Sequence, residues 1–245
     1  MNSTPLARSF VLVFLLLCAI EQVSAQQKIQ FEYSSTLPYN LPLPLTIRQS
    51  GMPDISLTAK YGSKPLVIPI TWIWRLAYWS GTSGWALQAV HHKLILENRP
   101  GEVEEFVISH GFNLFTIVRS WEIEEHIVRA GAGVVVAHPE NTIRGKKHPE
   151  DRGIFNWGYY IGGPTLTFSA SRQFPLPFRF YFNAEITAHA TYASVPVVDG
   201  NARLYSFVFA LTLGLGVDLY ISSSRLLAGG RPGLNLHTQR EARLL

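Results

Sequence analysis

The sequence predicts an all-β fold, an up-and-down antiparallel transmembrane β-barrel of about eight strands. Long stretches alternate between apolar and polar residues, as strands do because successive side chains point to opposite faces. Many of these stretches match or exceed the ~9–11 residues that a tilted strand needs to cross a bilayer. Short and long connections also alternate along the chain, which is the pattern that an up-and-down arrangement produces.

The N-terminal segment has the three parts of a secretory signal peptide. Arg8 supplies a positive charge, the run from Phe10 to Ile20 is apolar but too short to span a bilayer, and Val23-Ser24-Ala25 offers a small-residue cleavage site. We therefore expect the mature protein to start at Gln26. The single cysteine, Cys18, leaves with this peptide, so disulfides cannot hold the exported chain, and a closed barrel in lipid is one alternative.

The expected parts of the chain are a signal peptide at 1–25, a Pro-rich periplasmic lead at 26–53, the barrel at 54–221 and a flexible C-terminal tail at 222–245. Proline cannot donate a hydrogen bond to a sheet, so Pro38, Pro42 and Pro44 favour a lead or a plug over a strand. The tail has no periodic apolar pattern, which favours a flexible periplasmic extension.

Eight strands are expected within the barrel region. The clearest alternation runs from Pro177 to Thr191, where phenylalanine, alanine and isoleucine share one face and polar or charged residues share the other. An apolar face suits contact with lipid, and a polar face suits a narrow lumen. The expected strands lie near residues 54–62, 66–78, 84–96, 104–119, 125–138, 156–172, 177–191 and 203–221.

The connections support the same arrangement. Short links are expected around Ser80-Gly81, Ser120-Trp121 and Phe174-Pro175, and longer polar ones at Glu97–Val103, Pro139–Phe155 and Tyr192–Ala202. Outer-membrane barrels alternate short periplasmic turns with longer outer loops, and this parity fits an N-terminus in the periplasm. The tight Ser63-Lys64-Pro65 link is the exception, because it falls where an outer loop is expected.

With these strands and loops, residues 54–221 resemble the small eight-stranded bacterial outer-membrane proteins, the family of the OmpA membrane domain and OmpX. The resemblance covers about two thirds of the chain. It implies a bacterial outer-membrane location, contact with outer-membrane lipids and lipopolysaccharide, and insertion by the barrel-assembly machinery. The chain departs from that family after Tyr220, because those barrels commonly end on a terminal aromatic residue and a tail follows here.

Ionisable residues gather on the predicted inner face. A small barrel fills its interior with side chains, and buried charges must be paired. We therefore expect a closed, salt-bridged lumen in which Glu185 pairs with Arg179, Arg129 or Arg75. The alternative is an ion path or a polar ligand site that uses Glu185 and His189 as acid and base. The full expected network is Lys60, Arg75, Arg129, Arg179, Glu185, His189 and Asp218.

A second group of cations falls on the predicted lipid face. His91 and Lys93 share that face of one strand, and His110 shares it with Phe106, Ile108, Phe112 and Leu114 in the next. A simple hairpin at 97–103 would place His91 opposite His110, with Lys93 nearer the outer rim. Charges are less costly near the membrane interface. This arrangement predicts a contact with lipopolysaccharide phosphates.

Two alternatives remain for these histidines. A β-bulge near Gly111 or Gly84 would turn one of them inward. A lipid A-modifying hydrolase would use His110 or His91 as a catalytic base, but Ser109 is expected to face inward, away from such a base.

Composition and motifs narrow the function. The sequence lacks a basic stretch interleaved with aromatics, which nucleic-acid binding would need, and it lacks the His-Glu-x-x-His spacing of a metal site. No cofactor is expected. The expected function is that of a non-enzymatic outer-membrane protein that supports the envelope or presents surface loops. A lipid A-modifying hydrolase, or a narrow pore or ligand-holding barrel, is the alternative.

Overall fold

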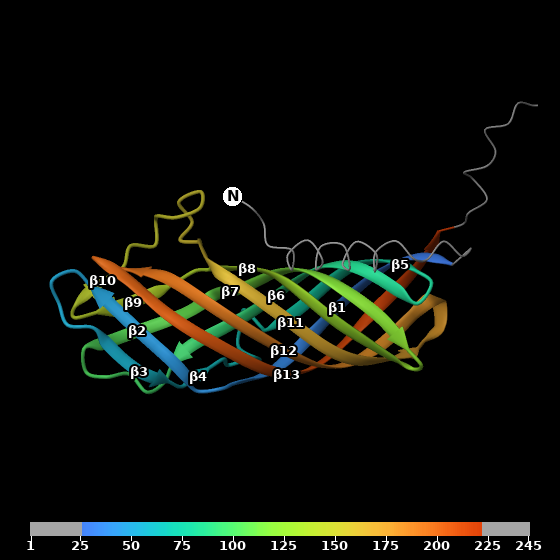
Figure 1. The fold of residues 1–245 in the computed structure, drawn as a ribbon, viewed down its shortest axis with the longest axis horizontal. Coiled ribbons are helices and arrows are strands. Elements are labelled where there is room, and N and C mark those ends of the chain that lie inside the picture. The colour runs from blue at the N-terminus through green and yellow to red at the C-terminus, as the bar shows by residue number, and fades with distance from the viewer. Residues whose placement is uncertain (1–25, 222–245) are drawn as a thin grey trace, which may run out of the picture.

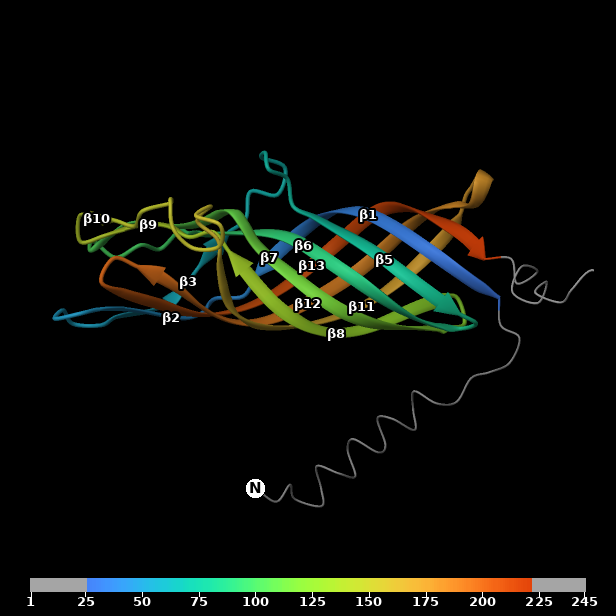
Figure 2. The same cartoon turned by 90° about the horizontal axis from the view of Figure 1, so that it is seen from above.

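In the computed structural model, which describes residues 26–221, the chain forms a closed antiparallel barrel of eight strands (Figures 1 and 2). Each strand pairs with the next, and the last pairs with the first, so the predicted fold class is confirmed. The predicted signal peptide and C-terminal tail lie outside the described residues. The ring consists of β1 (Gln27–Asn40), β5 (Trp72–Ser80), β6 (Ser83–Leu96), β7 (Val103–Ile123), β8 (His126–Ala137), β11 (Tyr160–Pro175), β12 (Phe180–Val197) and β13 (Gly200–Ile221).

Short strands lengthen the barrel wall at one end. They lie at the end opposite to Gln26 and Ile221, on the left of Figure 1. They are β2 (Leu43–Gln49), β3 (Ile55–Ala59), β4 (Tyr61–Gly62), β9 (Glu140–Ile143) and β10 (Lys146–Lys147). β2 pairs with β13 and β9 pairs with β7, so this extension continues the sheet of the barrel itself. Within residues 26–221, no helix is long and apolar enough to cross a membrane.

The first strand of the ring lies in the segment predicted to be a lead. β1 pairs with β13 along its whole length and with β5 from Gln27 to Ser35, so the expected lead at 26–53 is wrong. Pro38 lies beyond Ser35, where the pairing with β5 has ended. A proline without an N–H is tolerated at such a free edge. The expected first strand at 54–62 forms β3 and β4 instead, outside the ring.

The connections keep the predicted parity except between β12 and β13. Short turns join β5 to β6, β7 to β8 and β11 to β12, where the 3-10 turn η1 (Pro177–Arg179) lies. The tight 63–65 link belongs to a longer connection, 41–71, that carries β2 to β4, which removes the expected exception. The expected loop at 192–202 is wrong, because β12 and β13 continue as a paired hairpin that turns at Asp199.

The alternation of faces divides the barrel into a lipid-facing belt and an interior. Large apolar and aromatic side chains are exposed on the outer face around the half of the barrel nearer Gln26. A belt of this kind is what a transmembrane barrel presents to lipid. Its members include Phe31, Tyr33, Leu76, Leu87, Phe115, Ile117, Phe168, Ile186, Leu211, Leu213 and Leu215.

The interior has a polar layer within the belt and an apolar layer in the extended end. The apolar layer includes Leu45 and Leu204 and also Phe106, Ile108, Phe112 and Leu114, which were expected on the lipid face. That expectation is wrong because even-numbered residues of β7 point inward on both sides of a bulge. Across the bulge β6 advances by two residues, from His92 to Leu94, while β7 advances by four. Because side chains alternate between faces with a period of two, a bulge of two extra residues leaves the even-numbered residues on the same face on both sides of it.

A cysteine pair tests the closure of the ring by β1. Ile29 and Leu219 are register partners, and antiparallel partners have a Cα separation of about 4.5–5.5 Å, which a disulfide can bridge. We expect Ile29→Cys with Leu219→Cys to cross-link on mild oxidation, which a mobility shift on a denaturing gel would report. Ile29→Cys with Leu211→Cys is the offset control. Equal cross-linking of the two pairs would contradict the register.

Candidate functional site

Four charged side chains meet inside the membrane-spanning part of the barrel. Arg75 donates to Glu185 through two bonds of 2.9 and 3.2 Å and also contacts Glu32. Arg129 lies across from it, 3.4 Å from Glu32 and 3.7 Å from Glu185. Two arginines thus balance two glutamates, and each of the four is at most 2% exposed.

Neutral groups complete this network. Gln88 accepts two hydrogen bonds from Arg75, at 3.0 and 2.7 Å. The Tyr181 hydroxyl donates to Glu32 at 3.0 Å, and Ser171 accepts from Arg129 at 2.6 Å. Buried charges are stable only when paired and hydrogen-bonded. Each of the four charged groups has an opposite charge beside it and at least one hydrogen bond, and Arg129 Nε is the one guanidinium nitrogen in this network without a partner among residues 26–221.

The structure places the predicted lumen residues in three groups. Arg75, Arg129, Glu185 and His189 are buried in the lumen, and Glu185 pairs with two of the three expected arginines. Asp218 lies at the end of the barrel near Gln26, where it accepts a 2.7 Å hydrogen bond from Lys28 and a 2.8 Å bond from Gln30.

Two members of the expected network are not in the lumen. Arg179 is exposed in the turn before β12, and its guanidinium lies 5.4 Å from the centre of the Tyr220 ring. Lys60 is exposed between β3 and β4, because the segment around it is not a strand of the ring. Glu32, the second carboxylate that pairs with Arg75 and Arg129, was missed because it lies in the segment that was expected to be a periplasmic lead. The alternation of Gln30, Glu32 and Ser34 with Ile29, Phe31 and Tyr33 was the signal for it.

Between the two layers the lumen holds very little empty space. A cavity of ≈ 10 Å³ lies among His92, His189, Phe112 and Leu114. A cavity of that volume holds at most about one water molecule. The interior at this level is therefore packed with side chains.

The lysine and one histidine of the expected lipopolysaccharide contact are covered by the protein itself. His91 is opposite Asn113, not His110. Its Nδ1 donates a 2.9 Å hydrogen bond to the Asn113 side-chain oxygen, and its ring stacks on Trp72 with centres 5.5 Å apart. Lys93 is 3% exposed and donates to the carbonyls of Lys64 and Val67, both at 2.8 Å. The segment 63–71 thus occupies the Lys93 ammonium, and His91 is 6% exposed, so the predicted phosphate contact by His91 and Lys93 is wrong.

His110 belongs to a different cluster, built by the bulge of β7. Gly111 in this bulge has a φ of 140°, which side-chain-bearing residues rarely adopt, and its carbonyl accepts a 3.0 Å hydrogen bond from the N–H of His138. The bulge thus joins the end of β8 to β7. The predicted bulge is present near Gly111, but His110 turns outward, with its side chain 60% exposed.

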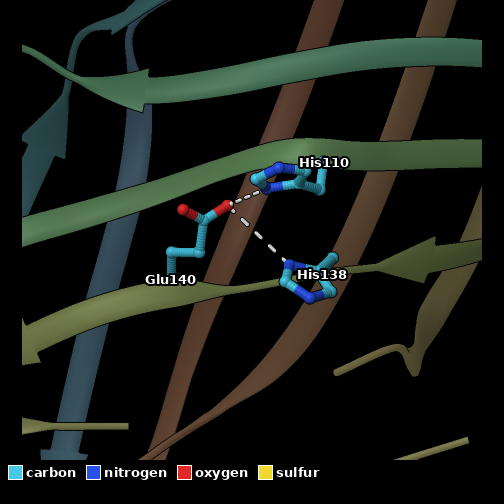
Figure 3. A group of neighbouring side chains, drawn as sticks. All are labelled: His110, His138 and Glu140. Atoms are coloured by element: carbon cyan, nitrogen blue, oxygen red, sulfur yellow. Dashed lines mark hydrogen bonds and ion pairs between the residues drawn. The ribbon is translucent and has the colours of Figure 1, made fainter. Parts of the chain in front are cut away.

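Figure 3 shows His110, His138 and Glu140 pointing toward one another from β7, the residue after β8, and β9. His110 Nδ1 lies 2.6 Å from Glu140 Oε1, and His138 Nδ1 lies 3.8 Å from the same oxygen. The Ser109 hydroxyl donates to that oxygen at 2.7 Å, so Ser109 does not point into the lumen as expected. One ligand atom from each of the three residues lies within 4.8 Å of the others.

Glu140 is ionised at neutral pH. Partial burial by itself raises the pKa of the Glu140 carboxyl, but hydrogen bonds from His110 and Ser109 outweigh it and hold the pKa below its ordinary value. The cluster therefore offers a carboxylate beside two imidazoles, a set of donors that binds divalent transition metals in proteins.

The sequence matches no protein-family model and no curated protein. Among solved structures it is similar to Ail, the attachment invasion locus protein of Yersinia pestis, with 12% identity and a TM-score of 0.38 over 80% of this chain and 100% of Ail. The outer membrane protein AlkL in lipid bilayers gives 12% identity and 0.47, over 84% of this chain and 96% of AlkL. Neisserial surface protein A gives 10% and 0.34, over 79% and 97%.

These likenesses are distant, and the location follows from the chain's own architecture. The barrel has an even number of antiparallel strands and short turns at the end near Gln26. At the other end three of the four connections are longer, and an apolar, aromatic belt surrounds the wall. Bacterial outer-membrane barrels have this combination. The protein is an eight-stranded β-barrel of the outer-membrane type, as the sequence predicted.

Removing one carboxylate tests the lumen network. Glu185→Gln leaves Arg75 and Arg129 with a single buried counter-charge, so we expect the unfolding free energy to fall by about 3 kcal/mol. Unfolding of the protein by urea in lipid vesicles measures this free energy. Glu125→Gln is the control, because Glu125 makes an exposed ion pair with Arg172 and should change little. Equal stability of the Glu185 variant and the wild type would mean that the network is hydrated.

Proposed function

We propose that the protein is a non-conducting outer-membrane barrel that acts through its extended, extracellular end. The observation that carries the proposal is the filled interior, in which the charge network around Arg75 lies below the apolar layer around Phe112. An ion would have to separate four paired charges and then cross a packed apolar core. Barrels of eight strands have interiors just wide enough for side chains, in agreement with this.

The extracellular end has the stiffness that a presenting surface needs. Arg144 joins three segments, because its guanidinium donates to Glu102 at 2.7 Å, to Gln49 at 3.1 Å and to the Pro53 carbonyl at 2.9 Å. Lys146 pairs with Asp199 at 2.7 Å in the β12–β13 turn. Ion pairs between connections hold them in one arrangement, which suits a structural or surface-presenting role in the envelope.

The proposed surroundings are the lipids of the outer membrane, with lipopolysaccharide at the outer end of the belt. The belt of exposed aromatic and aliphatic side chains supports contact with acyl chains. We expect the barrel-assembly machinery to insert the protein and expect no nucleic-acid partner.

Conductance and topology test this proposal together. We expect no steady single-channel current in planar bilayers, because the lumen is packed. We also expect an epitope tag inserted after Asp151 to be labelled on intact cells, whereas a tag after Glu124, in the β7–β8 turn, is labelled only after permeabilisation. Large steady currents, or surface labelling of the Glu124 tag, would contradict the proposal.

One observation favours a second candidate, a lipid A-modifying hydrolase. Ser109, His110 and Glu140 lie together on the outer face, where an acyl chain could reach them. The Ser109 hydroxyl would attack an ester carbonyl and pass its proton to Glu140, and the lipid alcohol would leave with that proton. Water would then hydrolyse the acyl-serine, which frees the fatty acid and restores the Ser109 hydroxyl. The lowered pKa of Glu140 makes it a weak base, and His110 is 3.4 Å from Ser109 through the same nitrogen that contacts Glu140. The hydrolase is therefore the second candidate function, after the non-conducting barrel.

Mass spectrometry of lipid A decides between the two functions. We expect lipid A from cells with the wild-type protein, with the Ser109→Ala variant and without the protein to have the same masses. Loss of one acyl chain that depends on Ser109 and on His110 would make the hydrolase the function. Gel mobility of the unheated, folded barrel confirms that the variants are folded.

A further inference from the structure

We propose that His110, His138 and Glu140 bind a divalent transition-metal ion of the Fe²⁺ to Zn²⁺ series. The inference is independent of the proposed function, since it concerns a site on the outer face of the barrel wall and not the lumen. Two imidazoles and one carboxylate on one side of an ion leave further positions open for water or another ligand, as in known two-histidine, one-carboxylate sites. Their ligand atoms already lie within 4.8 Å of one another.

The buried histidine is the observation that points to a ligand. His138 is 8% exposed, and its Nδ1 has no hydrogen-bond partner within residues 26–221. This nitrogen points toward Glu140, as Figure 3 shows, but the 3.8 Å separation is too long for a hydrogen bond. A buried polar atom without a partner costs free energy, and a metal held between His138 and Glu140 would satisfy it.

The surrounding residues hold the donors in place. Tyr159 packs its ring on His138, with centres 5.0 Å apart, and donates its hydroxyl to the His110 carbonyl at 3.1 Å. The backbone N–H of His138 donates to the Gly111 carbonyl in the bulge, and the Ser109 hydroxyl donates to Glu140 at 2.7 Å. Second contacts of this kind orient metal ligands in proteins.

Access from solvent is open on one side only. The His110 side chain is 60% exposed, whereas that of His138 is 10% exposed. An ion can therefore enter past His110, which needs to give up its present hydrogen bond to Glu140. The exposed Phe155 and Trp157 belong to the same connection as His138 and Tyr159, so the site lies beside an apolar loop.

Metal titration of the tag-free protein in detergent tests the site. After chelation and dialysis, we expect one equivalent of Co²⁺ to give visible absorption bands of nitrogen and oxygen coordination, and Zn²⁺ to displace it. A His-tag is avoided because it would bind both ions. His138→Ala and Glu140→Gln should each weaken Zn²⁺ binding in calorimetry by at least about 10-fold.

His126→Ala and His148→Ala are the matched controls, since His126 is exposed beside a turn at the other end and His148 is bonded to Tyr160 at 3.2 Å. Neither should change the affinity. His110→Ala is the third variant, because an exposed side chain can be removed without unfolding the barrel. The proposal is overturned if the wild type takes up no Zn²⁺, or if it binds no more tightly than the three cluster variants.

Discussion

Closure of the sheet is the constraint on which the rest of the structure depends. In a bilayer every backbone N–H and C=O must find a partner within the protein, so a transmembrane sheet has to close on itself. The closing contact is the pairing of β1 with β13 over 14 residues of β1. The same strand carries Glu32 into the lumen, between Arg75 and Arg129. Closure and charge balance therefore depend on one segment.

The two-layer interior follows from what each half of the wall faces. Within the belt, lipid takes the apolar side chains, so the polar residues of each strand point inward and have to satisfy one another. In the extended end the outer face meets water, and the inward positions become apolar, as Leu45, Phe106 and Leu204 show. The pattern of faces thus inverts along a continuous strand. In β7, therefore, the apolar residues are even-numbered from Phe106 to Leu114, where they fill the core, and odd-numbered at Phe115 and Ile117, where they face lipid.

Alternation was sufficient to predict β12 and most of the strands near β5, β6, β8 and β11, because their outward residues are apolar throughout the belt. It failed at β1, where prolines masked a strand whose far end has only one neighbour. It also failed in β7, where Phe106 and Phe112 are apolar because they fill a core and not because they meet lipid. An apolar residue can face lipid or the protein core, and a single sequence does not distinguish these two environments. Pairings across the ring, such as Glu32 with Arg75, require the closed register.

The bulge in β7 shows how a local irregularity can build a site that alternation conceals. A regular strand would place Ser109 and His110 on opposite faces. The two extra residues at 109–111 break that rule, so both side chains reach Glu140. The bulge lies where β7 leaves the belt and enters the extension, which is where a strand can lose ladder pairing at least cost, since water is near. Bulges are common beside functional sites, where they re-aim a side chain. Within residues 26–221 the His138 Nδ1 has no hydrogen-bond partner, and it lies beside a carboxylate and a second imidazole, so the bulge gathers the three donors that the proposed metal ion needs.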